Sequence, residues 1–118
     1  MFDTTLHTEQ NIICIAPEGR LDTVNCNQFE LAVKPHAEKE SYLIFDLSKC
    51  NYLSSSGIMV ILSAAKKLKS KGGSLYISGI TPEVYQVLEM AGLHRIFLFS
   101  ADCSAAAEEI NHARQKES

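Results

Sequence analysis

The stretch that decides the fold is YLIFDLSKCNYLSSSGIMVILSAAKKLKS, residues 42–70. Its beginning, Tyr42 to Leu47, is apolar on both faces until Asp46, which is typical of a central strand covered on two sides. Three consecutive serines follow. Beyond them, apolar residues recur at helical spacing, namely at Ile58, Ile61, Leu62, Ala65 and Leu68. The stretch therefore predicts a buried strand that leads through a serine-rich junction into an amphipathic helix.

Two strands and a helix are predicted ahead of this stretch. Residues 11–16 form a short apolar run that Pro17 and Gly19 are expected to stop, and residues 4–7 are expected to pair with it through a turn at residues 9–11. The helix has its apolar positions at Cys26, Phe29 and Val33.

The ends of this helix are predicted from its capping and breaking residues. Asp22 or Thr23, in the polar loop that precedes it, is the expected N-cap. Pro35 is expected to end or kink the helix near Val33 or Lys34, because proline lacks a backbone N–H and restricts the residue before it.

Beyond residue 70 the pattern continues to alternate between strand and helix. The predicted elements are a strand at residues 74–78, a helix from Thr81-Pro82-Glu83 to Gly92, a strand at residues 96–99 and an alanine-rich helix capped by Asp102 or Ser104. The sequence thus predicts one α/β domain over residues 1–118, with a polar C-terminal tail at about residues 114–118. We expect about four helices to pack on a mixed sheet of four to five strands.

Composition and charge exclude several classes of protein. With 46% hydrophobic and 21% charged residues, the chain has the composition of a globular domain. Its 11 basic and 14 acidic residues give a net charge of −3, so nothing draws it electrostatically to nucleic acid. No apolar run approaches the ~20 residues of a membrane span, and no secretory signal opens the chain. We expect a cytoplasmic protein that has no membrane span and does not contact nucleic acid directly.

Neither a metal site nor a cofactor is expected from the spacing of ligand-type residues. The cysteines and histidines form no CxxC, HxxxH or Cys-His ligand pattern; they are Cys14, Cys26, Cys50, Cys103, His7, His36, His94 and His112. Glycine-rich phosphate motifs are absent, and Leu53 replaces the first glycine that a Gly-x-Ser-x-Gly motif around Ser55 would need. No catalytic residue and no enzymatic activity are predicted.

The serine junction, Ser54 to Ser56, has two interpretations. One serine suffices to cap the helix that follows, because a serine oxygen satisfies an unpaired N–H of the first turn. The other two lie at the C-terminal exit of a strand, where open α/β sheets present functional groups. A phosphate there would meet the positive end of the helix dipole and free N–H donors. Capping and a phosphorylation or ligand site both remain open at this point.

Two blocks within this stretch carry a resemblance to a known family. Phe45-Asp46-Leu47-Ser48, followed by Tyr52-Leu53-Ser54-Ser55-Ser56-Gly57-Ile58, resembles the signature of STAS domains, specifically of bacterial anti-sigma factor antagonists. Gly19-Arg20-Leu21-Asp22 resembles the first characteristic loop of that family, and segments at residues 72–75, 81–84 and 92–93 fall where the family has them. The resemblance covers nearly the whole chain in the right order.

The resemblance implies a STAS fold and a partner-switching function. In that family the unphosphorylated antagonist binds an anti-sigma factor that is also a serine kinase, which releases a sigma factor. The kinase then phosphorylates the antagonist, and a PP2C-type phosphatase resets it. By position, Ser55 is the implied phosphoacceptor. The implied partner-binding residues are Asp22, Ser54, Ser56 and Gly57.

One position departs from the family pattern, and other functions are left open. Many members have an aspartate where this chain has Ser54, so a charge that caps the helix or aligns the acceptor hydroxyl is missing, which bears on kinase efficiency. STAS domains also serve in stressosomes, lipid-transport complexes and other partner-switching assemblies. A small serine-dependent enzyme is a further alternative, disfavoured because no base or oxyanion motif accompanies the serines.

Overall fold

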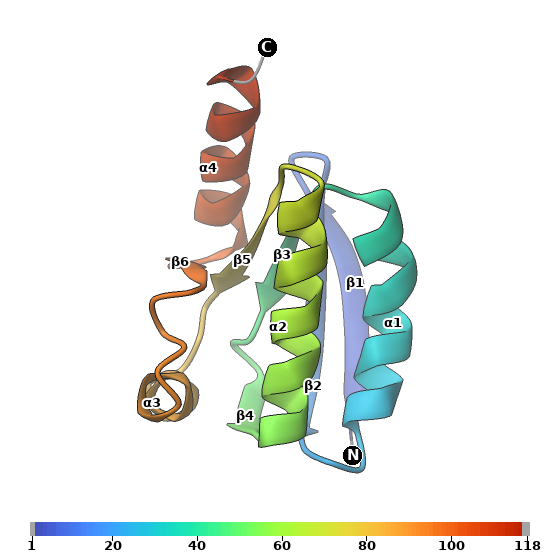
Figure 1. The fold of residues 1–118 in the computed structure, drawn as a ribbon, viewed down its shortest axis with the longest axis vertical. Helices are drawn as coiled ribbons and strands as arrows, with labels where there is room; N and C mark the ends of the chain where they lie inside the picture. Colours follow the sequence, from blue (N-terminus) through green and yellow to red (C-terminus); the bar gives the residue numbers. More distant parts are fainter. Residues whose placement is uncertain (1, 117–118) are drawn as a thin grey trace.

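The computed structural model describes residues 2–116 as one mixed sheet with helices on both faces (Figure 1). In chain order the elements are β1 (Asp3–Glu9), β2 (Ile12–Leu21), α1 (Cys26–Lys39), β3 (Tyr42–Asp46), β4 (Cys50–Leu53), α2 (Ser55–Ser70), β5 (Ser74–Ser78), α3 (Pro82–Met90), β6 (Leu98–Ser100) and α4 (Cys103–Lys116). The strand order is β1-β2-β3-β5-β6, and β4 pairs with β2 beside this path. The predicted α/β class and mixed sheet are confirmed.

The N-terminal hairpin forms where the sequence predicts it. β1 and β2 pair antiparallel in a register that sets His7 opposite Cys14. Gln10 and Asn11 make the turn with φ values of 51° and 69°. Two positive φ values give a turn whose twist matches that of the strands it joins. The remaining strand pairs are parallel, so the carboxyl ends of β2, β3 and β5 point toward one end of the sheet (Figure 1).

Strands β2 and β4 differ from the expectation. Pro17 and Gly19 do not stop β2, which continues to Leu21 and pairs there with β4 after a register shift between Gly19 and Arg20. The positive φ of Gly19, 107°, accommodates this bend in the strand. β4 lies in a segment for which the sequence predicts no strand, and it makes the sheet six-stranded, against the four to five strands expected. Its sequence signal is weak because only the two end residues of this short strand are buried.

The sequence predicts that Pro35 ends or kinks helix α1 near Val33 or Lys34, and the helix in fact continues past the proline to Lys39. Burial of Phe29, Val33 and Ala37 along one face holds the helix on the sheet on both sides of the proline. Lys71, just past the end of α2, bonds through Nζ to the carbonyls of Ala37 and Glu40 and so satisfies acceptors at the end of α1. Tertiary contacts therefore outweigh the hydrogen bond that the proline removes.

The last two elements also have shifted bounds. β6 covers Leu98–Ser100 in place of residues 96–99, and Ile96 is exposed. α4 begins after Asp102, whose Oδ1 accepts a hydrogen bond of 2.8 Å from the Ala105 N–H, so Asp102 is its cap. The helix extends to Lys116, over part of the segment expected as a polar tail, while residues 117–118 lie outside the described chain.

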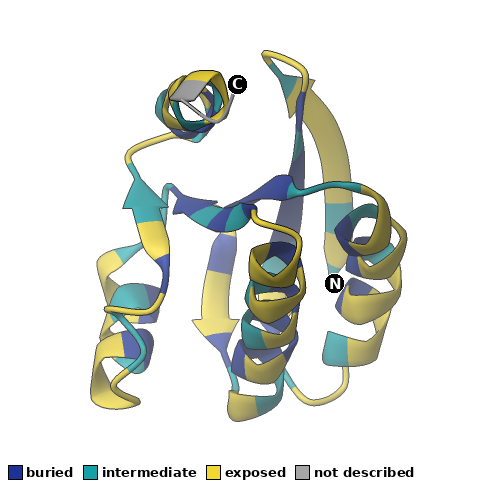
Figure 2. Ribbon diagram, turned by 45° about the horizontal axis from the view of Figure 1, so that its top comes forward, coloured by how far each residue is buried: buried dark blue, intermediate teal, exposed yellow. Residues whose placement is uncertain are grey.

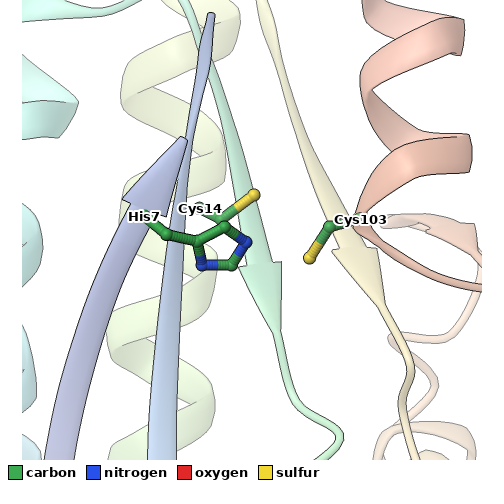
Figure 3. Close-up of side chains that lie close together, drawn as sticks. All are labelled: His7, Cys14 and Cys103. Atoms are coloured by element: carbon green, nitrogen blue, oxygen red, sulfur yellow. The ribbon is translucent and has the colours of Figure 1, made fainter. Parts of the chain in front are cut away.

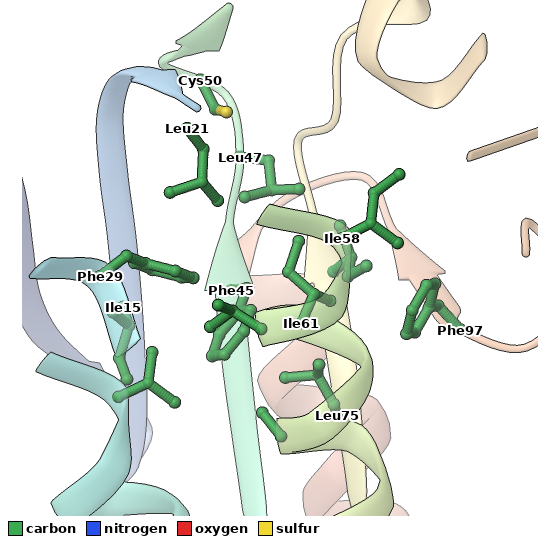
Figure 4. Packing of buried hydrophobic residues seen from close by; sticks show 14 of the residues in the cluster. Ile15, Leu21, Phe29, Phe45, Leu47, Cys50, Ile58, Ile61, Leu75 and Phe97 are labelled. Atoms are coloured by element: carbon green, nitrogen blue, oxygen red, sulfur yellow. The ribbon is translucent and has the colours of Figure 1, made fainter. Parts of the chain in front are cut away.

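The sheet is covered on both faces by cores of unequal size (Figure 2). Alternate residues of β2 and β3 point to opposite sides, so Ile15 and Phe45 face α1 and α2 while Ile44 faces α4. The larger core lies under α1 and α2, where the rings of Phe29 and Phe45 meet edge to face with centroids 5.4 Å apart (Figure 4). Across residues 2–116, none of the helices combines the length and the apolar character that crossing a membrane requires.

Candidate functional site

The serine junction and the loop that contains Asp22 lie at the same end of the sheet (Figure 1). The carbonyl of Leu21, the last residue of β2, accepts hydrogen bonds from the Ser54 N–H at 3.0 Å and from its hydroxyl at 3.1 Å. Pairing of β2 with β4 sets Leu21 beside Leu53 and thus brings the two segments together. The loop that contains Asp22 and the start of α2 therefore lie next to each other.

The three serines have different environments. Ser54 is the N-cap of α2: its Oγ accepts a hydrogen bond of 3.1 Å from the Gly57 N–H while its own proton goes to Leu21. Ser55 is exposed, and within residues 2–116 no group hydrogen-bonds its hydroxyl. Ser56 is half-buried. One serine is thus committed to capping, and the next presents an unbonded hydroxyl to solvent.

The start of α2 is electrostatically suited to an anion. Its first turn contains Ser55, Ser56 and Gly57 and has no acidic side chain to offset the positive end of the helix dipole. A phosphate on a residue there would be favoured by the dipole and by N–H groups that have no partner within the helix. The start of α2 is therefore suited to stabilise a negatively charged group, such as a phosphate on a serine of its first turn.

Gly57 is buried, and the space around it explains why a glycine occupies this position. A Cβ there would lie 2.9 Å from the Leu21 carbonyl oxygen and 3.0 Å from side-chain atoms of both Leu21 and Leu53. These contacts are too short for any side chain, so glycine lets α2 approach the ends of β2 and β4. Its predicted contact with a partner stays a prediction.

The sequence predicts Asp22 or Thr23 as the N-cap of α1, but neither residue holds that position. Asp22 instead orders the loop before the helix. Its Oδ1 accepts hydrogen bonds of 3.0 Å each from the N–H groups of Val24 and Asn25, and Asn25 holds the N-cap position. The loop places an extra turn between Asp22 and the helix. The half-exposed carboxylate keeps Oδ2 turned to Arg20, whose Nε lies 3.8 Å away.

Apolar and aromatic side chains that the sequence analysis did not single out flank these residues. Val24 is 85% exposed in the Asp22 loop, and Met59 is 60% exposed one turn after Ser55 on the same face of α2. Tyr52, at the end of β4, has the guanidinium of Arg20 4.1 Å from its ring centroid. Met59 lies outside the buried stripe of α2, and Val24 lies in a polar loop. An apolar residue at a position where the sequence pattern predicts exposure is the signal that could have identified both.

Comparison with known proteins adds independent information. The model of the STAS domain family matches residues 3–106. BtrV of Bordetella bronchiseptica, which is named as an anti-sigma factor antagonist, is 32% identical over 97 residues, covering 81% of this chain and 82% of that protein.

Solved structures agree in fold. The crystal structure of an anti-sigma factor antagonist from Mycobacterium paratuberculosis matches with a TM-score of 0.83 at 20% identity, covering 94% of this chain and 95% of that one. The phosphorylated form of the Bacillus cell fate determinant SpoIIAA matches with a TM-score of 0.67 at 17% identity, covering 92% of this chain and 98% of that one. At such identities the likeness shows the fold alone.

Proposed function

This chain belongs to the STAS domain family, and from that premise we propose that it is an anti-sigma factor antagonist. In its unphosphorylated form it binds an anti-sigma factor that is also a serine kinase, and thereby releases a sigma factor. Phosphorylation by that kinase ends the complex, and a PP2C-type phosphatase restores it. The protein acts by binding and not by catalysis, in the cytoplasm where sigma factors work.

The observation that carries this proposal is the contrast between the first two serines of the junction. Ser54 uses both its acceptor and its donor capacity within the fold, so its phosphorylation would break the cap of α2. The neighbouring Ser55 hydroxyl is exposed and unbonded among the described residues, at a helix N-terminus that tolerates a dianion. We therefore assign Ser55 as the phosphoacceptor.

The surface around Ser55 supplies the proposed interface with the anti-sigma factor. Exposed apolar side chains at Val24 and Met59 offer area that a partner would remove from water. Asp22 contributes a charged group at the same end of the sheet, and Ser54 and Ser56 border the acceptor. A phosphate introduced among these groups would be desolvated against the partner.

The serine at position 54 bears on the rate of phosphorylation. An ionised aspartate there would accept the Gly57 N–H but could not donate to the Leu21 carbonyl, as the Ser54 hydroxyl does at 3.1 Å. The serine thus ties the junction to β2 in a way that an aspartate does not. In this proposal the cap is retained and only the charge beside the acceptor is lost.

The decisive experiment compares wild type, Ser55→Asp and Ser55→Ala in partner binding. Pull-down from the native cytoplasm identifies the partner, and calorimetric titration measures its affinity. Ser55→Asp is expected to weaken binding by more than about 100-fold, because an unpaired buried charge costs several kcal/mol and ~1.4 kcal/mol is tenfold in affinity. Ser55→Ala is expected to bind like wild type and to resist the kinase.

Circular dichroism controls for folding of both variants, and phosphopeptide mapping after reaction with the kinase locates the modified serine. A phosphate on Ser54 or Ser56 would overturn the assignment. If folded Ser55→Asp binds with wild-type affinity, phosphorylation of Ser55 does not control partner binding. If the pull-down captures transport or chemotaxis components in place of an anti-sigma factor, the chain belongs to another STAS assembly.

A further inference from the structure

A histidine and two cysteines from three separate elements meet on the face of the sheet that α4 covers (Figure 3). His7 on β1 stands opposite Cys14 on β2 in the hairpin register, and Cys103 is the first residue of α4. Their ligand atoms, one imidazole nitrogen and two sulfurs, all lie within 4.8 Å of one another. The spacing of these residues along the chain gives no hint of the cluster, and its members are far from the serine junction in the fold.

The surroundings of the cluster suit a cation. Cys14 is fully buried and Cys103 is half-buried, so solvent has little access to either sulfur. The negative charge of Asp46 acts on both sulfurs, and that of Glu9 acts on the sulfur of Cys14. Two sulfurs with little access to solvent therefore lie beside carboxylates whose negative charge would attract a cation.

Groups around the three side chains provide support and access. The fully buried Ser78 hydroxyl lies 3.3 Å from the sulfur of Cys103, where it can orient that sulfur. The cross-strand register fixes His7 relative to Cys14. His7 is exposed, so an ion can reach the cluster from the solvent side of β1 without opening the core.

We propose that His7, Cys14 and Cys103 bind one Zn²⁺ ion through an imidazole nitrogen and two thiolates, with a fourth position left for water or another ligand. Zinc takes cysteine sulfur at about 2.3 Å and histidine nitrogen at about 2.0–2.1 Å, which places tetrahedral ligand atoms roughly 3.5–3.8 Å apart. The ligand atoms lie within 4.8 Å of one another, so binding would require them to move closer by about 1 Å or less. Each thiol releases its proton to solvent as its bond to the metal forms.

The ion would add a link between α4 and the hairpin, which already share the smaller core and the hydrogen bond from Asn111 to Gln10. The core beneath α4 is the smaller of the two, and its buried members contributed by the helix are Ala106, Ala107 and Ile110. A bond network from β1 and β2 to the first residue of α4 would anchor that helix at its start. Binding should therefore raise the melting temperature of the whole domain.

The test uses the untagged, full-length chain, reduced and metal-free, titrated anaerobically with Co²⁺ and then with Zn²⁺. Co²⁺ is expected to give a sulfur-to-metal charge-transfer band in the near ultraviolet that saturates at one equivalent, and Zn²⁺ is expected to bleach it. His7→Gln, at an exposed position that leaves the core intact, and Cys103→Ser are each expected to weaken binding more than about 100-fold, beyond what loss of an outer partner costs. Cys26→Ser is the matched control and should bind like wild type.

Three results would overturn the proposal. They are the absence of a charge-transfer band in the folded wild type, unchanged affinity in both His7→Gln and Cys103→Ser, and loss of binding in Cys26→Ser. Rapid formation of a Cys14–Cys103 disulfide in air without any metal binding under reducing conditions would likewise assign the pair to redox chemistry. None of these outcomes bears on the phosphorylation of Ser55, because the two sites share no residue.

Discussion

The hydrophobic cores on the two faces of the sheet differ in size and in the side chains that form them. Under α1 and α2 the core is large and aromatic, and it continues into the packing of Gly57 against Leu21. Under α4 the helix contributes only Ala106, Ala107 and Ile110 to the buried core, and the strand residues of that core include Cys14 near the start of β2. We infer that the stability of the fold and the geometry of the serine junction depend mainly on the core under α1 and α2. Substitutions in the smaller core under α4 should lower the stability of the domain less.

The largest effect is expected from removing an aromatic ring on the first face. Phe45→Ala should lower the free energy of unfolding by about 3–5 kcal/mol, because it deletes a fully buried ring and its edge-to-face contact with Phe29. Ile44→Ala, next along the same strand but facing α4, is the matched control and should cost about 2–3 kcal/mol. Urea unfolding followed by circular dichroism measures both. An equal or larger loss for Ile44→Ala would erase the contrast between the faces.

The second effect concerns α4 itself. Ile110→Ala should cost about 2 kcal/mol, at the low end for such a change, because a helix held by small side chains can shift into the space left behind. Amide hydrogen exchange is expected to accelerate along α4 and to remain slow in α2. Uniform acceleration across both helices would mean that the two faces unfold as one unit.

An effect of similar size is expected where the first face meets the serine junction. Gly57→Ala should destabilise the domain by about 1–3 kcal/mol, since the new Cβ would lie 2.9 Å from a backbone oxygen that cannot move without β2. It should also slow phosphorylation of Ser55 by displacing the start of α2. Ser56→Ala, at the neighbouring position, serves as the control for stability. Wild-type stability in Gly57→Ala would show that α2 is free to retreat from the sheet.

The smallest change in stability is expected at Asp22. Asp22→Ala removes two hydrogen bonds that order a half-exposed loop, which should cost no more than about 1 kcal/mol. Its effect on phosphorylation or partner binding should be larger than its effect on melting temperature. Asp22→Asn keeps the acceptor and removes the charge, so kinase assays on both variants separate loop order from electrostatics. A large drop in melting temperature with intact phosphorylation would reduce Asp22 to a structural residue.

The sequence predicts the first face better than the second. Helical periodicity in residues 58–68 and the apolar strand before it reflect deep burial, which leaves a strong pattern. The prediction that α1 ends before Pro35 was wrong because packing on both sides of the proline holds the helix together. The sequence did not predict β4 because only the two ends of that strand are buried. Predictions from sequence patterns use only residues that are close along the chain, whereas the end of α1 and the formation of β4 depend on contacts between residues that are far apart in sequence.

The candidate sites show the same division. Ser55 and its neighbours form a contiguous motif, so a resemblance could locate them, and the structure adds which serine is committed to the cap. The cluster of His7, Cys14 and Cys103 draws one residue from each of three elements. The alignment of His7 with Cys14 could be predicted from the sequence, because a two-residue turn at Gln10 and Asn11 determines the hairpin register. The position of α4, which brings Cys103 close to them, could not be predicted in this way.

The length of β2 has a consequence for how the two sites communicate. Cys14 and Leu21 lie on this one strand, seven positions apart, or about 23 Å at roughly 3.3 Å per residue. That separation is more than twice the Debye length of about 8 Å at physiological ionic strength, so solvent screens the charge at one site from the other. A phosphate at the serine junction and a cation at the hairpin would therefore interact only weakly through their charges, and β2 is a strand that connects both positions mechanically.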